Sequence, residues 1–216
     1  MTPGLRERKK ERTRQLIADT AKQLFAERGF EAVTVGEIAR AAEVAEATVF
    51  NYFPTKEDLF YGRLEAFEEM LLSAIRDRGP GESVLTAFGR FLTAQEGVLA
   101  FRSPDGDEAA TEQLHTMTRV ITASPALLAR ERQVFDRYTR ALTALLAEET
   151  GASDEDAEPA LAAAAIVALH RTLIEHVRRR ALAGATVPQI RRSVRAQARR
   201  GVALLEQGLR DYAPRS

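Results

Sequence analysis

The chain has 216 residues, and its 31 basic and 31 acidic side chains give a formal net charge of zero. This length allows one or two domains with a buried core, and the charge balance is unlike that of a protein that coats nucleic acid without sequence preference. No cysteine indicates disulfides, thiol chemistry or structural zinc, and no apolar run approaches the roughly 20 residues of a membrane-spanning helix, so we expect a cytoplasmic protein without membrane contact.

The first predicted helix begins with a basic segment. Residues 5–14 hold six basic and two acidic side chains, with Arg8, Lys9 and Lys10 at the centre. Taken alone, this segment fits a solvated helix surface as well as a binding surface. Further along the helix the pattern becomes amphipathic, and Gly29 is placed to end it.

Residues 34–60 are predicted to form two short helices, a tight turn and the start of a third helix. Each short helix carries an apolar stripe at a spacing of three or four residues, and the two stripes must face each other. The stripes consist of Val35, Ile38 and Ala39 on the first helix and of Val49 and Phe53 on the second. The outward face of the second helix then consists of Glu46, Ala47, Phe50 and Asn51, with Thr48 and Tyr52 on its flanks.

Start and stop signals support this division. Thr34 and Glu37 have the spacing of a capping box, in which each side chain satisfies a backbone N–H of the other residue. Pro54 ends the second short helix, because the residue before a proline is pushed away from helical angles. Thr55 can cap the next helix, which leaves Lys56 at the helix start, where its ammonium can reach a phosphate.

The outward face of the second short helix needs a binding partner, because it exposes a large aromatic side chain beside an amide. A helix-turn-helix unit supplies one when its second helix lies in the DNA major groove. Asn51 can make a bidentate contact with adenine, and Glu46 can accept a hydrogen bond from a cytosine amino group. Phe50 or Ala47 can pack on a thymine methyl group. Phosphate contacts are then expected from Thr34, Thr48, Tyr52, Lys56 and the basic segment with Arg8, Lys9 and Lys10.

The stretch from Gly29 to Leu59 resembles the DNA-binding domain of the tetracycline-repressor (TetR) family of bacterial transcriptional regulators. The resemblance depends on "LFAERGF" at the end of the first helix, on the "FNYF" motif that precedes Lys56, and on Thr34, Ile38, Ala39, Val44 and Thr48. The chain departs from the family pattern at three positions. Glu43 stands where Gly is usual in the turn, Ala45 replaces a small hydroxylic residue, and Phe50 replaces a common Tyr.

Beyond this unit the chain reads as further helices without a convincing strand, about nine helices in total. The expected fold is all-α, with a helix-turn-helix domain over residues 1–56 and a helical effector-binding and dimerisation domain over residues 57–216. The resemblance implies that a helix over residues 57–77 connects the two.

Dimerisation is expected through the last two helices, as the resemblance implies. The apolar spacing alone fits an internal core face equally well. A basic cluster between residues 178 and 200 is either a second nucleic-acid surface or a solvated face that pairs with the acidic residues 154–158 or with a partner subunit. The expected interface residues are Ile166, Leu169, Leu173, Val194, Val202 and Leu205.

The second domain is expected to hold a small-molecule site between its helices. The chain has three histidines and neither a Gly-rich phosphate loop nor an HExxH or GxSxG motif, so we expect neither an enzyme nor a bound cofactor or metal. Several aromatic side chains with a few polar ends favour a mainly apolar or aromatic effector. The candidate lining residues are Phe88, Phe91, Phe101, His115, Met117, Tyr138 and His170.

These features together predict a sequence-specific DNA-binding transcriptional regulator. The expected form is a homodimeric repressor that binds a palindromic double-stranded DNA operator and is released by a small-molecule effector. Two alternatives stay open: a DNA-binding activator or nucleoid-type protein without a ligand, and a helical enzyme or adaptor with the same fold.

Overall fold

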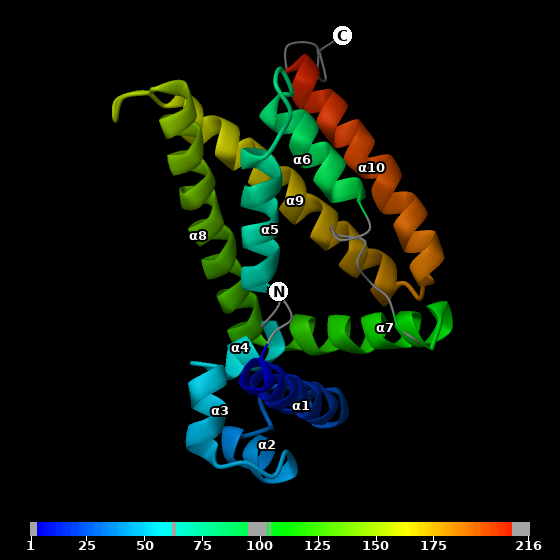
Figure 1. The fold of residues 1–216 in the computed structure, drawn as a ribbon. Coiled ribbons are helices and arrows are strands. Elements are labelled where there is room, and N and C mark those ends of the chain that lie inside the picture. The colour runs from blue at the N-terminus through cyan, green and yellow to red at the C-terminus, as the bar shows by residue number, and fades with distance from the viewer. Residues whose placement is uncertain (1–3, 62–63, 95–102, 104, 209–216) are drawn as a thin grey trace. The chain divides into compact units, whose positions relative to one another are not determined.

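The structure, a computed structural model, describes residues 4–61, 64–94, 103 and 105–208 (Figure 1). Within this range the chain forms ten α-helices and no strand, which confirms the all-α class. The helices are α1 (Leu5–Arg28), α2 (Val35–Ala41), α3 (Glu46–Tyr52), α4 (Lys56–Tyr61), α5 (Leu64–Arg76), α6 (Val84–Thr93), α7 (Asp107–Ala123), α8 (Pro125–Thr150), α9 (Glu158–Leu182) and α10 (Val187–Gln207).

The order of the helices agrees with the expectation, and the count differs at one place. The connecting helix expected over residues 57–77 is described as two segments, α4 and α5, and residues 62–63 between them lie outside the described range. Helix α6 ends at Thr93, with Ala94 as its C-cap.

The chain divides into two compact units. The first, which we call the head, comprises residues 1–66 and 119–132, and the second, which we call the body, comprises residues 67–118 and 133–216. The head thus includes a segment that the sequence placed in the second domain. This segment, residues 119–132, contains the last residues of α7 and the first residues of α8. We call it the α7–α8 corner.

In the head, α1 packs on α2 and α4, and α2 packs on α3 (Figure 1). The two apolar stripes of the short helices meet, since Ile38, Val49 and Phe53 are all buried in one cluster with Phe25 of α1. Val120 and Leu127 of the α7–α8 corner complete this cluster. The head core is therefore built from two parts of the chain that are far apart in sequence.

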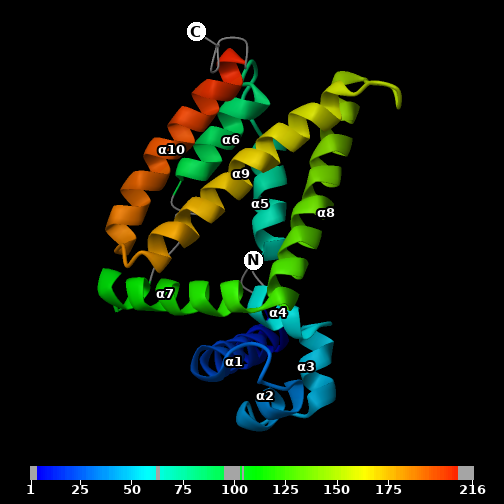
Figure 2. The same cartoon turned by 180° about the vertical axis from the view of Figure 1, so that it is seen from behind.

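In the body, α6, α9 and α10 pack against one another (Figures 1 and 2). Two glycines make this packing close. A Cβ atom on Gly201 of α10 would overlap Cδ1 of Leu169 on α9, and a Cβ atom on Gly89 of α6 would lie 3.1 Å from Cγ2 of Val202. Small residues at these crossings let the helices approach more closely than ordinary side chains allow.

Helix α9 is long and apolar enough to cross a membrane by length and composition, with a mean hydropathy of 1.4 in its most apolar window. In this structure Ile166, Val167 and Leu173 of α9 are buried in the core of the body. A helix with one face in a protein core passes the same test. We therefore describe α9 as a core helix.

Candidate nucleic-acid interface

The turn between α2 and α3 keeps its geometry without a glycine. Glu43 adopts a positive φ of 53°, the left-handed conformation that the usual Gly adopts easily. The backbone N–H of Val44 donates to the carbonyl of Ala39 at 2.9 Å, which closes the end of α2 in the manner of a Schellman motif. A residue with a Cβ atom in this conformation lowers the stability of the fold by about 1 kcal/mol, and the turn forms nevertheless.

Helix α3 begins without a side-chain cap. Ala45 has the extended conformation of an N-cap residue, but it has no side-chain oxygen to accept the first free N–H groups of the helix. The departure seen in the sequence therefore weakens the start of α3 without changing its position.

The six side chains of α3 that were expected to contact DNA have the expected exposure. Phe50 is 45% exposed, an unusual state for a large aromatic residue. A carboxylate oxygen of Glu46 lies 3.2 Å from the position that a Cβ atom on Gly36 would take, so Glu46 also contacts the start of α2. The exposed members are Glu46, Ala47, Phe50 and Asn51, and the half-buried members are Thr48 and Tyr52.

Thr34 is engaged in the capping box that the sequence predicted. Its hydroxyl and its backbone N–H both donate to Glu37, each at 2.8 Å, and the Glu37 N–H donates back to the hydroxyl. Hydrogen bonds from the Thr34 backbone and hydroxyl, and then the ion pair with Arg28 at 2.8 Å, lower the pKa of Glu37 to about 2. The donors of Thr34 are therefore already used within the capping box, and a phosphate would have to share them.

Lys56 does not extend into solvent from the start of α4. Its ammonium lies over the ring of Phe30, 4.3 Å from the centroid, and 5.9 Å from the centroid of Phe25. Such cation–π contacts hold a charged group at a partly desolvated site. Burial lowers the pKa of Lys56, and the nearby carboxylate of Glu31 opposes that effect.

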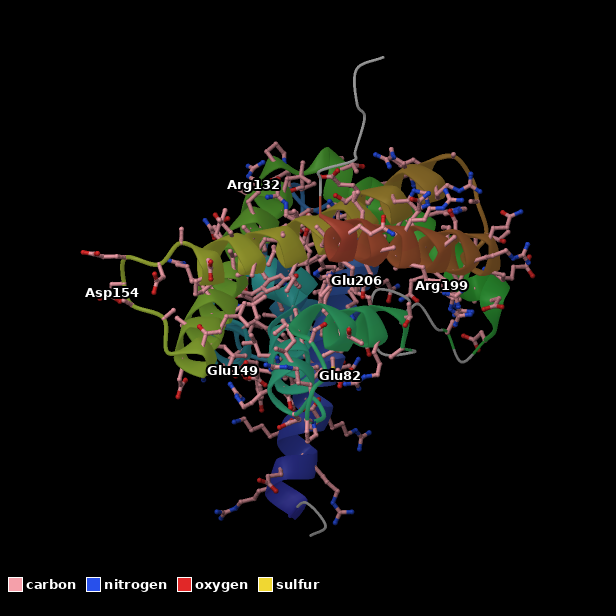
Figure 3. All side chains as sticks on the ribbon, turned by 90° about the horizontal axis from the view of Figure 1, so that it is seen from above. Glu82, Arg132, Glu149, Asp154, Arg199 and Glu206 are labelled. Atoms are coloured by element: carbon pink, nitrogen blue, oxygen red, sulfur yellow. The ribbon has the colours of Figure 1, made fainter. Side chains whose placement is uncertain are left out.

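The basic segment forms the first turns of α1, a regular helix, drawn in blue with its side chains in Figure 3. Arg8, Lys9 and Lys10 are exposed there. Arg14, further along the same helix, places its guanidinium 5.4 Å from the ring centroid of Phe53 and so also contacts the head core.

Three of the residues expected to line an effector site, Phe88, Phe91 and Tyr138, lie in one buried cluster of the body. Tyr138 and His170 come together, because the Tyr138 hydroxyl and the His170 Nδ1 share a buried hydrogen bond. Phe135, which the sequence analysis did not select, has its ring 5.7 Å from Tyr138 and 5.5 Å from His170. Burial lowers the pKa of His170 to about 3, so the ring is neutral near pH 7.

Of the other described candidates, two lie on α6 and two on α7. Phe88 and Phe91 are buried on α6, and Met117 is half-buried on α7. His115 Nε2 lies 2.9 Å from the Ala185 carbonyl oxygen and links α7 to the loop before α10. Phe101 lies outside the described residues.

The residues expected at a dimer interface divide into two groups. Ile166, Leu173 and Val194 are buried inside the single chain, so they belong to the body core and are not available at a surface. Leu169, Val202 and Leu205 are partly exposed. Apolar periodicity identified an inward face correctly, but it did not tell a core contact within one chain from a contact between two chains.

The head, with two short helices, a tight turn and an exposed α3 beside a basic α1, is a helix-turn-helix DNA-binding unit. The sequence profile of the family described as "Bacterial regulatory proteins, tetR family" matches residues 17–61, and that of the "MftR C-terminal domain" matches residues 93–198. The chain belongs to the TetR family and is a DNA-binding transcriptional regulator.

Curated relatives support this assignment. The chain is 33% identical over 174 residues to the HTH-type transcriptional regulator TcmR of Streptomyces glaucescens, covering 79% of this chain and 75% of TcmR. It is 27% identical over 176 residues to MftR of Mycobacterium tuberculosis, covering 78% of this chain and 81% of MftR. It also matches the nucleoid occlusion factor SlmA of Pasteurella multocida, at 29% identity over 134 residues, 59% of this chain and 62% of that protein.

Solved structures share the fold. NalD of Pseudomonas aeruginosa, the secondary repressor of the MexAB-OprM multidrug efflux pump, aligns with a TM-score of 0.57 and 23% identity over 95% of this chain and 100% of NalD. FadR of Bacillus subtilis in complex with stearoyl-CoA aligns with a TM-score of 0.52 and 22% identity over 88% of this chain and 96% of FadR.

Proposed function

We propose that the chain acts in the cytoplasm as a homodimeric repressor that binds a palindromic operator and is released by a small-molecule effector. The observation that carries this proposal is the exposed face of α3, where Phe50 and Asn51 lie outward on a helix-turn-helix whose core is otherwise complete. A two-fold dimer presents two such helices and therefore favours a two-fold symmetric site.

The proposed division of roles follows the chemistry of the side chains. Asn51 reads adenine, Glu46 reads cytosine, and Phe50 with Ala47 contacts thymine methyl groups. Helix α3 contains neither Lys nor Arg, so guanine readout from this helix is not expected. Phosphates are held by Thr34, Thr48, Tyr52, Lys56, Arg8, Lys9 and Lys10.

The dimer is proposed to form through the outward faces of α9 and α10. Leu161 of α9 is 67% exposed, an unusual position for a leucine, and Ala164, Ala168 and Thr172 continue this exposed face along the helix. Leu169, Val202 and Leu205 are partly exposed beside it, and the buried Ile166, Leu173 and Val194 support it from within the chain.

The effector is proposed to be largely apolar or aromatic and to bind in the body. Phe135, Tyr138 and His170 place three rings and a polar pair at one point, which suits recognition of an aromatic ligand with one polar group. The complex of FadR with stearoyl-CoA is a precedent for an apolar ligand in a protein of the same fold. The ligand shifts the DNA-binding equilibrium only by its difference in affinity for the two states.

The first experiment selects DNA from a random-sequence pool with the purified full chain. We expect a two-fold symmetric site. Asn51→Ala is then expected to lower the preference for that site over random DNA, whereas Lys56→Ala weakens binding to both by a similar factor. Selection of no site, or an equal loss of both kinds of binding in Asn51→Ala, contradicts the proposed readout.

A second candidate function is a DNA-binding protein that needs no small molecule. The similarity to nucleoid occlusion factors favours it. A screen of apolar and aromatic metabolites for release of the selected DNA separates the two functions. Release by one class of compound supports the repressor, and absence of release across the screen supports the ligand-independent protein.

A further inference from the structure

A side-chain hydrogen bond joins the α7–α8 corner to Glu31, the residue that follows Phe30. Ser124 is only 1% exposed and caps α8, since its hydroxyl oxygen accepts the Leu127 N–H at 3.2 Å. The same hydroxyl donates to the carboxylate of Glu31 at 2.6 Å. The buried Ser124 therefore holds one oxygen of the Glu31 carboxylate, although Glu31 itself is an exposed residue.

The corner also contacts α4, the helix that starts with Lys56. Arg130 forms an ion pair with Asp58 at 2.6 Å, and both side chains are mostly buried. The Tyr61 hydroxyl donates to Glu131 at 3.4 Å. The corner thus contacts Glu31, next to Phe30, and two side chains of α4, the helix that begins with Lys56.

Glu31 acts on Lys56 without a direct ion pair. Among the carboxylates around this ammonium, Glu31 has the largest charge effect, ahead of Glu57 and Glu37. No ion pair of 4.0 Å or less joins Glu31 to Lys56 within the described part of the chain, and the ammonium lies instead on the face of Phe30. The bond to Ser124 opposes such an ion pair by position: it holds one oxygen of the carboxylate at the corner and so restricts where the Glu31 side chain reaches.

Helix α7 connects the corner to the start of α10. In the body, the Val187 N–H donates to the Thr111 hydroxyl at 2.9 Å, and Arg191 pairs with Asp107 at 2.8 Å. The helix continues without a break from these contacts to the corner, where it ends at Ala123. The helix that carries these contacts in the body is thus the one that ends immediately before Ser124.

We propose that Ser124 and Glu31 are positioning residues for Lys56 and, through it, for DNA. With the corner in place, Ser124 holds Glu31, and the Lys56 ammonium can leave the ring of Phe30 for a phosphate. When the corner moves so that the hydrogen bond from Ser124 is broken, the Glu31 carboxylate is released to pair with Lys56. The contact between Lys56 and the DNA phosphate is then lost. This inference rests on the proposed function, in which Lys56 contacts the DNA backbone.

The test uses the full chain and its selected DNA site, with affinity measured as a function of salt concentration. Ser124→Ala is expected to weaken binding by about threefold to fivefold near 0.15 M salt and to lower the salt slope by about one per subunit. Ser124→Thr retains the hydroxyl and is expected to bind as the unmodified chain does.

The decisive variants combine substitutions. Adding Glu31→Gln to Ser124→Ala is expected to restore both affinity and slope, because an amide does not form an ion pair with Lys56. Glu57→Gln is the matched control: it removes a nearby charge that Ser124 does not hold, and it is not expected to restore the slope. In a Lys56→Ala background, Ser124→Ala is expected to have no further effect on the slope.

Two outcomes separate the inference from the function on which it rests. If Lys56→Ala lowers the salt slope but Ser124→Ala does not, or if Glu31→Gln fails to restore it, the positioning role is overturned and the proposed function stands. If Lys56→Ala leaves the slope unchanged, the phosphate contact itself is absent. A folding defect from the lost cap of α8 does not imitate the expected result, because Glu31→Gln does not repair a cap.

Discussion

The head and the body differ in how far apart in sequence their defining contacts lie. In the head, α2 and α4 each begin with a cap made by residues three positions apart, Thr34 with Glu37 and Thr55 with Asp58. In the body, the contacts that set the helix positions join distant residues, such as Gly201 with Leu169. The outline of the head is therefore a local property of the sequence, and the geometry of the body is a property of the assembled chain.

The head departs from this rule at one point, its core. Val120 and Leu127 come from the α7–α8 corner, and Leu127 is fully buried. A compact set of helices as small as α1–α4 has little apolar surface to bury, so two further side chains are a considerable addition. The comparison therefore predicts that the head depends on this corner for its stability.

The largest effect is expected from Leu127→Ala. The substitution removes a fully buried side chain from the head core and should lower the free energy of unfolding by about 3 kcal/mol. Chemical denaturation measures the loss, and amide hydrogen exchange should place it in α1–α4. Leu128→Ala, at a half-buried neighbouring position, is the matched control with a smaller effect. An equal effect of both substitutions contradicts a core shared with the corner.

The next effect tests the body. Gly201→Val places a branched side chain where even a Cβ atom overlaps Leu169, and we expect a loss of about 2 kcal/mol. Adding Leu169→Ala should recover part of it, because the crowding is then relieved. Thermal or chemical unfolding of the single and double variants gives the coupling between the two positions. If the double variant recovers no stability, the close approach of α9 and α10 is not the cause of the loss in Gly201→Val.

The head and the body are expected to lose stability at different acidic pH values. His170 in the body titrates near pH 3 when folded and near 6.5 when unfolded, so the unfolded chain binds the proton first. Its contribution to the free energy of unfolding is complete above pH 6.5 and falls by about 1.4 kcal/mol for each pH unit below that value. The expected loss at pH 5 is therefore roughly 2 kcal/mol. His176, whose pKa burial also lowers, adds to the same trend.

The head should respond at lower pH. Glu37, with a pKa of about 2, keeps its contribution above its ordinary value of 4.5 and loses it as the pH falls toward 2. Hydrogen exchange at pH 5 is therefore expected to show weakened protection in the body before the head. His170→Asn should flatten the slope of unfolding free energy between pH 6.5 and 5. A slope that survives this substitution in full assigns the effect to other groups.

The smallest expected effect is a gain. Ala45→Ser supplies the side-chain oxygen that the start of α3 lacks and should raise the free energy of unfolding by about 1 kcal/mol. Thermal unfolding measures this gain. Ala41→Ser, at the exposed last position of α2 where no N-terminal cap is needed, is the control and should give no gain. Equal gains at both positions contradict the absence of a cap as the cause.

The sequence by itself determined the order of the helices, the capping box of Thr34 with Glu37 and the face that α3 exposes. Each of these depends on residues three or four positions apart, and helical geometry converts that spacing directly into a shared face or a shared hydrogen bond. The left-handed conformation of Glu43 is different: the sequence shows a departure from the usual Gly, and only the structure shows that the turn keeps its geometry. The contacts of this outward face with DNA stay a prediction.

Only the tertiary structure decided which faces meet. Apolar periodicity marked Ile166, Leu173 and Val194, but it did not reveal that α9 and α10 bury them within one chain. Nor did it pair Tyr138 with His170 or place Lys56 on the ring of Phe30. The physical reason is that spacing along a helix defines an apolar stripe, whereas the surface that covers the stripe depends on the packing of distant segments. At such a crossing, a single glycine determines how closely two helices approach.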